Sequence, residues 1–290
     1  REMVVHNVCT RSKGPGVSTL ETLCTHKVLK LMTSAVRRKG WTNNKPLLHQ
    51  ILQHNLPHYI RQHLQNLLLS DWRLYDTVTL HLLGVLLGPR TSSLKLTHVR
   101  IFYRDALLQM LLGLHDIQEF ILQDPIWTFS RRQLILAGEA ISQMTQLRVL
   151  KLQYCAHDYL LAAVGDSCHN LLVLDVRGSR SVSDRGIAAL ITPASAMEGQ
   201  LLKGGKKQDS GRCLGKAVKS ITSKITMALV EPKSLENDNE LEEDSIVQLS
   251  PCCQTLVCVD LRCTKVSSTG VAWLTSAVSP KARIASIIGS

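Results

Sequence analysis

The chain has 290 residues, of which 44% are hydrophobic and 20% are charged. This composition is typical of a soluble globular protein with a buried core, and it excludes a chain that is disordered throughout. Lysine and arginine exceed aspartate and glutamate by 34 − 23 = 11, which is compatible with acidic protein partners or with nucleic acid. The four Trp, five Tyr and three Phe do not cluster among the basic residues, so stacking on single strands has little support and nucleic acid is not an expected partner.

The sequence has no marks of a membrane or secreted protein. No apolar run reaches the 18 residues that a membrane helix needs, and no signal-peptide pattern opens the chain. The nine cysteines form no C-x-x-C pair, and we interpret them as free, mostly buried thiols in a reducing compartment, the cytoplasm and/or the nucleus. Because the first residue is Arg1 rather than methionine, the sequence leaves open a fragment that has lost a leader.

The chain begins with a segment that is poor in regular structure and continues with a helical pattern. Residues 1–18 contain a Gly-Pro-Gly sequence and are predicted to form a flexible lead-in. From Thr19 the apolar residues recur at spacings of three and four, which predicts a helix with one apolar stripe. That helix is expected to end near Arg37, where basic residues and then Gly40 follow.

Further helices are predicted within residues 19–90, the expected helical region. One has Pro46 in its first turn and runs to about His54. The next begins at Pro57, because an early helical position has no backbone donor to lose. Its apolar face is formed by Leu56, Ile60, Leu64, Leu67 and Leu68. A last helical stretch, from about Asp71 to Leu87, leads into residues 91–290.

The stretch from Cys168 to Leu190 has the pattern of one leucine-rich repeat. Leu171, Leu174 and Val176 follow the L-x-x-L-x-L spacing of a short strand with one buried face, and residues 184–190 form a helical pattern. The clearest copy runs from Cys253 to Leu274. Its corresponding residues are Leu256, Val259, Leu261, Gly270 and Val271.

Three more copies are predicted before this stretch. Their apolar positions are Leu147, Leu150 and Leu152 in one, Ile117, Phe120 and Leu122 in a weaker one, and Leu96, Val99 and Ile101 in the weakest. One repeat cannot bury its apolar face alone, whereas stacked copies form a continuous core. We therefore predict an α/β leucine-rich-repeat solenoid preceded by an N-terminal helical box. The alternative is a set of unrelated buried strands in an α/β sheet.

A charged insertion at about 193–243 is predicted to interrupt the repeats. Residues 203–224 hold seven basic side chains and one acidic, whereas residues 231–244 hold seven acidic and one basic. Blocks of like charge usually lie in solvated loops. The pattern becomes regular again after the insertion, and residues 282–290 are read as a last strand.

The motifs of the common enzyme and cofactor sites do not occur in the sequence. There is no P-loop, no G-x-S-x-G and no H-E-x-x-H. His54 and His58 have helical spacing, but Pro57 lies between them and no second ligand pair stands nearby, so we read them as surface residues. We expect a binding protein rather than an enzyme, with no cofactor and no metal.

The predicted binding surface is the concave face of the strands. The side chains that alternate with the buried leucines there are Lys151, Gln153, Asp175, Arg177, Asp260 and Arg262. Mixed charge on adjacent strands suits a polar segment of a protein substrate better than a polyphosphate, which requires one sign. For each of these residues, solvated surface without a binding role is the alternative.

Two short motifs in the helical region resemble ligase-recruiting boxes. Leu20-x-x-x-Cys24-x-x-x-Val28, preceded by Thr19, resembles the Elongin-binding BC box. Leu56-Pro57-x-x-Ile60 is similar to the Cullin-2 box that follows it in von Hippel–Lindau-type receptors. Followed by leucine-rich repeats, this order resembles the Zyg, Zer and PRAME-like substrate receptors of Cullin-2 ubiquitin ligases.

The resemblance implies a substrate-recognition adaptor that binds Elongin B/C, Cullin-2 and an unknown protein substrate. The Elongin-binding residues that it implies are Leu20, Cys24 and Val28, and the residues that form or support the cullin contact are Leu56, Pro57, Ile60 and Leu64. The 27 residues between Val28 and Leu56 are more than the family pattern has between the two boxes, and no armadillo-like region follows the repeats.

Three alternatives stay open at this point. The seven box residues could only hold the helices together. An F-box-like module with leucine-rich repeats, recruiting a Skp-type adaptor and Cullin-1, also opens with Leu-Pro, although the Cys-x-x-Trp-like end of that module is missing after Leu56. The third is a leucine-rich-repeat scaffold that recruits no ligase.

Overall fold

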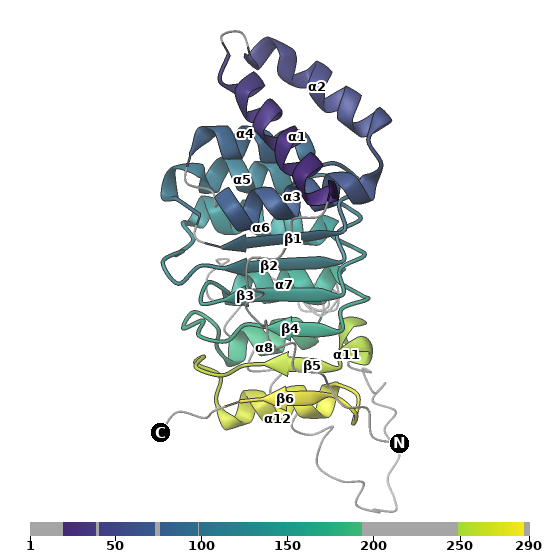
Figure 1. The fold of residues 1–290 in the computed structure, drawn as a ribbon. Helices are drawn as coiled ribbons and strands as arrows, with labels where there is room; N and C mark the ends of the chain where they lie inside the picture. The colour runs from purple at the N-terminus through teal and green to yellow at the C-terminus, as the bar shows by residue number, and fades with distance from the viewer. Residues whose placement is uncertain (1–19, 39–40, 73–75, 98, 193–248, 287–290) are drawn as a thin grey trace, which may run out of the picture.

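A computed structural model describes residues 20–38, 41–72, 76–97, 99–192 and 249–286 (Figure 1). The predicted lead-in at 1–18 and the charged insertion at 193–243 lie outside the described residues. Within the described ranges, no helix combines the length and the apolarity that crossing a membrane requires.

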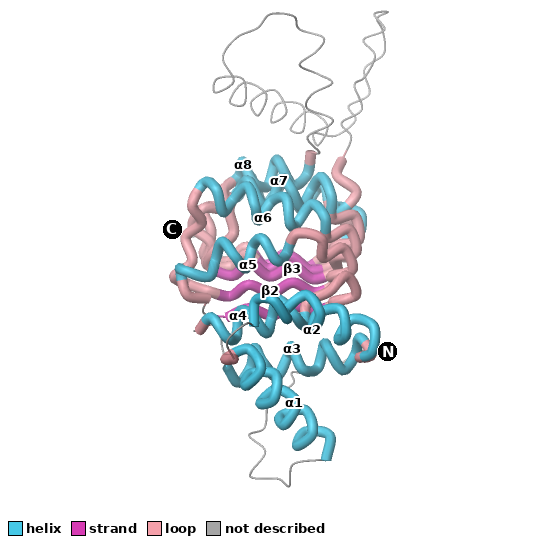
Figure 2. Tube along the Cα trace, turned by 90° about the horizontal axis from the view of Figure 1, so that it is seen from above, coloured by secondary structure: helices cyan, strands magenta, loops and turns pink. Residues whose placement is uncertain are grey.

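The protein is an α/β structure with one six-stranded parallel sheet, in which the strands follow one another in chain order. They are β1 (Ser93–Thr97), β2 (Glu119–Gln123), β3 (Val149–Gln153), β4 (Val173–Asp175), β5 (Cys258–Asp260) and β6 (Arg283–Ala285). Between or after them come the 3-10 turn η1 (Ile101–Tyr103) and the helices α5 (Arg104–Leu111), α6 (Arg131–Gln143), α7 (Asp158–Ser167), α8 (Asp184–Ile191), α11 (Cys252–Thr255) and α12 (Ser268–Ala277). Helices α5 to α8 lie together on one face of the sheet (Figure 2).

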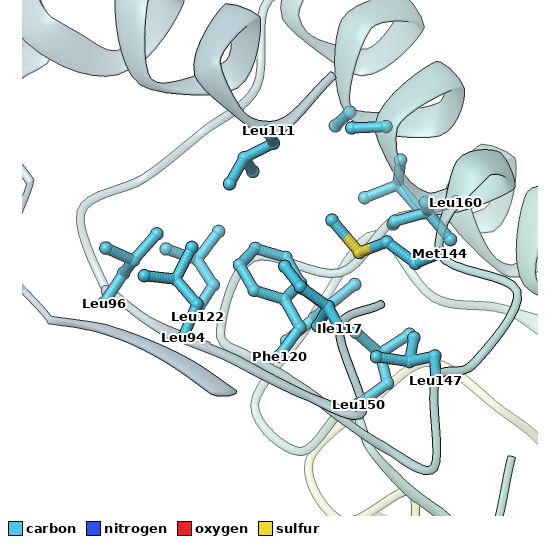
Figure 3. Packing of buried hydrophobic residues seen from close by; sticks show 14 of the residues in the cluster. Leu94, Leu96, Leu111, Ile117, Phe120, Leu122, Met144, Leu147, Leu150 and Leu160 are labelled. Atoms are coloured by element: carbon cyan, nitrogen blue, oxygen red, sulfur yellow. The ribbon is translucent and has the colours of Figure 1, made fainter. Parts of the chain in front are cut away.

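Equivalent apolar positions of successive strands lie in register beneath these helices. Phe120, Leu150, Leu174, Val259 and Ile284 are partners across five neighbouring strands. The first four of them are buried, as are the leading residues Ile117, Leu147, Leu171 and Leu256. Figure 3 shows strand residues such as Phe120, Leu122 and Leu150 on the side of the sheet that faces Leu111 and Leu160 of the helical layer. The apolar spacing thus builds one continuous core, because each strand extends the row of its neighbour.

The weakest predicted copy has a different register from the one expected. Leu94 pairs with Phe120 and Leu96 pairs with Leu122, so Leu96 holds the third apolar position rather than the first. Ile101 is 65% exposed and contributes nothing to the core. Thr91 is buried at the first position, where its hydroxyl accepts a hydrogen bond from the Gly88 amide. A threonine in place of a leucine explains why the spacing misled the prediction.

A ladder of aspartates joins the helices of neighbouring strand–helix units. Asp158 accepts hydrogen bonds from the amide and the hydroxyl of Ser183 at 2.8 and 2.6 Å. Asp184 does the same for Ser267, at 2.7 and 2.6 Å. Each serine also caps its own helix, α8 or α12. One carboxylate therefore fixes the start of the next helix, where a negative charge also favours the helix dipole.

The N-terminal helices α1–α4 precede the sheet (Figure 1). They are α1 (Leu20–Val36), α2 (Trp41–Asn55), α3 (His58–Trp72) and α4 (Thr77–Leu86). The prediction for α2 was wrong in one respect, because the helix begins at Trp41 and encloses Pro46 instead of placing it in the first turn. Trp41, the first residue of α2, is buried in the core.

Helix α3 attaches the N-terminal helices to the edge of the sheet. The side-chain amides of Gln62 and Gln65 donate to the Ser93 carbonyl at 2.6 and 2.9 Å. The Gln62 carbonyl oxygen accepts from the Ser93 amide at 3.3 Å. Leu64 and Leu68 are fully buried on the same helix. The backbone groups of Ser93, at the start of the edge strand β1, are thereby paired by side chains of α3.

Candidate protein-interaction surfaces

Helix α1 is apolar on two faces, and only one of them is buried. Leu29, Met32 and Val36 pack into the core, where α1 contacts α4 and α3. On the other side, Leu23, Val28 and Leu31 are 58%, 39% and 60% exposed. We call the exposed group of Leu23, Cys24, Val28 and Leu31 the outer face of α1. Apolar side chains gathered on one exposed helix face are typical of a site for another protein.

Two of the three residues predicted to bind Elongin lie on this outer face. Cys24 is exposed with a free thiol, and Val28 follows one turn later. Leu20 is the first residue of α1, and its side chain is outside the described residues. The Elongin-binding motif leaves out Leu23 and Leu31, although the apolar spacing predicts both on the same stripe as Cys24 and Val28.

The residues predicted for the cullin contact differ in accessibility. Pro57 is exposed, and its carbonyl accepts the first backbone bonds of α3, from Ile60 and Arg61. Leu56 and Ile60 are half-buried against the core. Leu64 is 1% exposed, so it can support such a contact from inside but cannot touch a partner.

The residues predicted to bind a substrate come together on the face of the sheet that alternates with the core positions. Lys151, Asp175 and Asp260 are register partners on β3, β4 and β5. Gln153 donates to the Asp175 carboxylate at 2.5 Å. These polar side chains form a row across three strands, as the alternation of the sequence predicts.

Each aspartate of this row is paired with the arginine two positions later. The Arg262 guanidinium donates to Asp260 at 2.6 and 2.9 Å, and Arg177 lies 3.6 Å from Asp175. The hydrogen bonds from Arg262 hold the pKa of the Asp260 carboxyl below its usual range, against the opposing effect of its partial burial. The Asp260 carboxylate is therefore a charged partner in an ion pair rather than a group poised to exchange protons.

One acceptor in this row has no partner. Gln153 is 4% exposed, and its Oε1 atom is buried without a hydrogen bond among the described residues. Lys151 is half-buried and takes part in no ion pair within the same ranges. A free acceptor beside a free cation suits a ligand with both donors and acceptors, such as a peptide segment.

No protein-family model and no curated protein matches the chain. Its function must therefore be argued from the surfaces described above.

Four of the described cysteines are buried in the core, and the two histidines with helical spacing lie on the surface. Cys155, Cys168, Cys252 and Cys253 are free and buried, and burial raises the pKa of the Cys168 thiol to about 12. A thiol with this pKa is inert at neutral pH. His54 and His58 are both exposed, and in the described part of the chain no group of three His, Cys, Asp or Glu residues is arranged to hold a metal ion.

Proposed function

We propose that the protein is a leucine-rich-repeat substrate receptor of a Cullin-2 ubiquitin ligase that binds Elongin B/C. The observation that carries this proposal is the outer face of α1, where Cys24 and Val28 stand exposed with Leu23 and Leu31 beside them. The buried side of the same helix is already occupied by the core. The outer face is therefore free to enter a groove of another protein as a preformed helix.

Polar residues after the strands support the leucine-rich-repeat part of the proposal. The consensus has asparagine or cysteine three positions after the third leucine, and this chain has cysteine, serine or threonine there in three places. Cys155, Ser179 and Thr264 hold this position. The Ser179 hydroxyl donates to the Leu152 carbonyl at 3.0 Å, and the Cys155 thiol lies 3.8 Å from the Leu122 carbonyl. Residues of this kind close the bend after each strand, which a stack of similar units requires.

In this proposal the row of Lys151, Gln153, Asp175, Arg177, Asp260 and Arg262 takes up the substrate. A protein substrate held there would lie at a fixed distance from the helices that recruit the ligase. Catalysis then takes place on other subunits, and the chain contributes proximity. Such an adaptor works in the cytoplasm and/or the nucleus.

Co-purification tests the recruitment step. Val28→Asp places a charge on the outer face of α1 and should abolish capture of Elongin B/C by the 290-residue chain. The matched control is Ile135→Asp on α6, because Ile135 is also a partly exposed aliphatic residue, 43% against 39%. Wild type and the control should capture Elongin B/C equally. Equal capture by Val28→Asp, or none by wild type, would refute the proposal.

The same purification separates the competing assemblies. A double change of Pro57→Ala and Ile60→Ser should leave Elongin B/C bound and reduce Cullin-2, because both residues lie at the start of α3 and away from the outer face of α1. Recovery of a Skp-type adaptor and Cullin-1 instead would favour an F-box-like receptor. Recovery of neither adaptor would favour a scaffold without a ligase.

A further inference from the structure

A groove lies between α2, α3 and the turn before β1, and its lining is basic. Its volume is about 560 Å³, and it is open to solvent. Arg61, Arg90, His49 and His54 line it together with two glutamines and a proline. No acidic residue is among the described residues that line it. The groove is therefore a concentration of positive charge without compensation from the protein.

Arg61 is the unusual member of this lining. Its side chain is 6% exposed, its Nε atom is buried without a hydrogen bond, and its guanidinium makes no ion pair with the described residues. Burying a charge is costly unless hydrogen bonds and an opposite charge compensate it. An arginine left in this condition has donors available for a ligand.

A second buried arginine shows how this protein compensates such a charge elsewhere. Arg104 is 5% exposed, and its guanidinium lies 3.5 Å from the Asp124 carboxylate. It also donates to the Val99 carbonyl at 3.3 Å and stacks over Trp127 at 4.9 Å. Arg104 thus has an anion, an acceptor and a ring as partners. Arg61 has none of these partners among the described residues, although its exposed fraction is nearly the same as that of Arg104.

The electrostatics of the groove add to this difference. Burial lowers the pKa of Arg61, and the positive charge of Arg90 lowers it further. Arg61 belongs to the first turn of α3, where the helix dipole is positive as well. The two arginines line one open volume, so an anion there would be attracted by both of them.

We propose that this groove binds a phosphate dianion, either free phosphate or the phosphoryl group of a phosphorylated side chain. Guanidinium groups match the oxygens of phosphate with paired hydrogen bonds. A carboxylate carries one negative charge and would balance only one of the two arginines, whereas a phosphate monoester carries about −1.5 to −2 at pH 7. This site does not depend on the proposed ligase function.

Calorimetric titration of the 290-residue chain tests the proposal. The probes are inorganic phosphate, N-acetyl-O-phosphoserine amide and acetate, at matched ionic strength because exposed charges are screened by salt. We expect both phosphate probes to bind. Arg61→Gln and Arg90→Gln should each weaken binding by about tenfold or more, the size of one lost charge-assisted hydrogen bond. The control is Arg132→Gln, an equally conservative change at an exposed position of α6.

The variants and probes keep each outcome decisive. Arg90 is exposed, so Arg90→Gln should fold even if the change at Arg61 disturbs the packing of α3. Tighter binding of the phosphoserine amide than of inorganic phosphate would assign the groove to phosphorylated side chains, and the reverse order would assign it to free phosphate. Absence of binding by both, equal binding of acetate, or an equal loss in Arg132→Gln would overturn the proposal.

Discussion

The strand region, residues 91–286, and the N-terminal helices differ in how their helices use their surfaces. In the strand region, α7 and α8 pack against the sheet and against helices on both sides, because each unit adds to the last. Among the N-terminal helices, α3 closes the edge of β1, while α1 buries one face and leaves Leu23, Val28 and Leu31 exposed. The difference teaches that α7 and α8 lie between neighbouring helices on both sides, whereas α1 has neighbours on one side only and keeps an apolar face exposed.

The contrast predicts that a Leu→Ala change lowers the free energy of unfolding strongly in the core row and hardly at all on the outer face of α1. Leu150→Ala should lower the free energy of unfolding by about 2–5 kcal/mol, because Leu150 is fully buried in the core row. Leu31→Ala should change it by less than about 0.5 kcal/mol, because Leu31 is 60% exposed. Urea unfolding measures both. Similar losses in the two variants would remove the distinction between core and outer face.

The aspartate ladder should account for a smaller part of the stability of the strand region. Asp158→Ala removes both acceptors of Ser183 and should cost about 2–3 kcal/mol, since hydrogen bonds to a charged group are the strong ones. Asp116 is exposed, and Asp116→Ala provides the control with an expected change within about 0.5 kcal/mol. If urea unfolding gives the same value for both variants, the ladder contributes nothing beyond surface charge.

Two helical glycines sharpen the comparison further. A Cβ atom at Gly165 on α7 would lie 2.6 Å from the Leu190 carbonyl oxygen, which is backbone and cannot turn away. Gly165→Ala should therefore destabilise by about 1–2 kcal/mol despite its better helix propensity. At Gly84 on α4 the nearest atom is the flexible Met110 side chain at 3.2 Å, so Gly84→Ala should be neutral or stabilising by up to about 1 kcal/mol. Thermal unfolding should show a lower melting temperature than wild type for Gly165→Ala, and an equal or higher one for Gly84→Ala.

The smallest expected effect concerns the Asp260–Arg262 pair. The pKa of Asp260 is lower in the folded protein than its ordinary value of about 3.9, so its contribution to stability is present above that pH and is lost as the pH falls through the folded pKa. Asp260→Asn should be less stable than wild type at pH 7, and the gap should close below about pH 4. A gap that widens on acidification would contradict the ion pair. Urea unfolding at several pH values measures this difference.

The sequence predicted the parts of the fold that depend on apolar spacing. Leu147, Leu171 and Leu256 are buried just before β3, β4 and β5 as expected, because three apolar residues in fixed order leave one register. The first copy was misplaced, because Thr91 stands where the other copies have a leucine or isoleucine. The Asp158–Ser183 contact was not predicted. A signal for it was present, because serine stands directly before both α8 and α12.

The candidate sites depend on tertiary packing and were therefore only partly predictable. The Asp-x-Arg pairs could be read from the chain, since both partners lie on one strand end. Leu64 fits the same apolar pattern as Ile60, and only the packing of α3 shows that one is sealed and the other half-exposed. Arg61 could not be identified from the sequence, because the lack of an acidic residue near it depends on how α2, α3 and the turn before β1 pack together.

The central claim is that the outer face of α1 docks a partner while its inner face holds the fold. Calorimetric titration of purified Elongin B/C into the purified chain, with wild type and Cys24→Phe, tests it most directly. We predict saturable binding at one heterodimer per chain that Cys24→Phe abolishes, with the unfolding midpoint of the variant unchanged because Cys24 is exposed. Absence of binding in the wild type, or undiminished binding in the variant, would contradict the account.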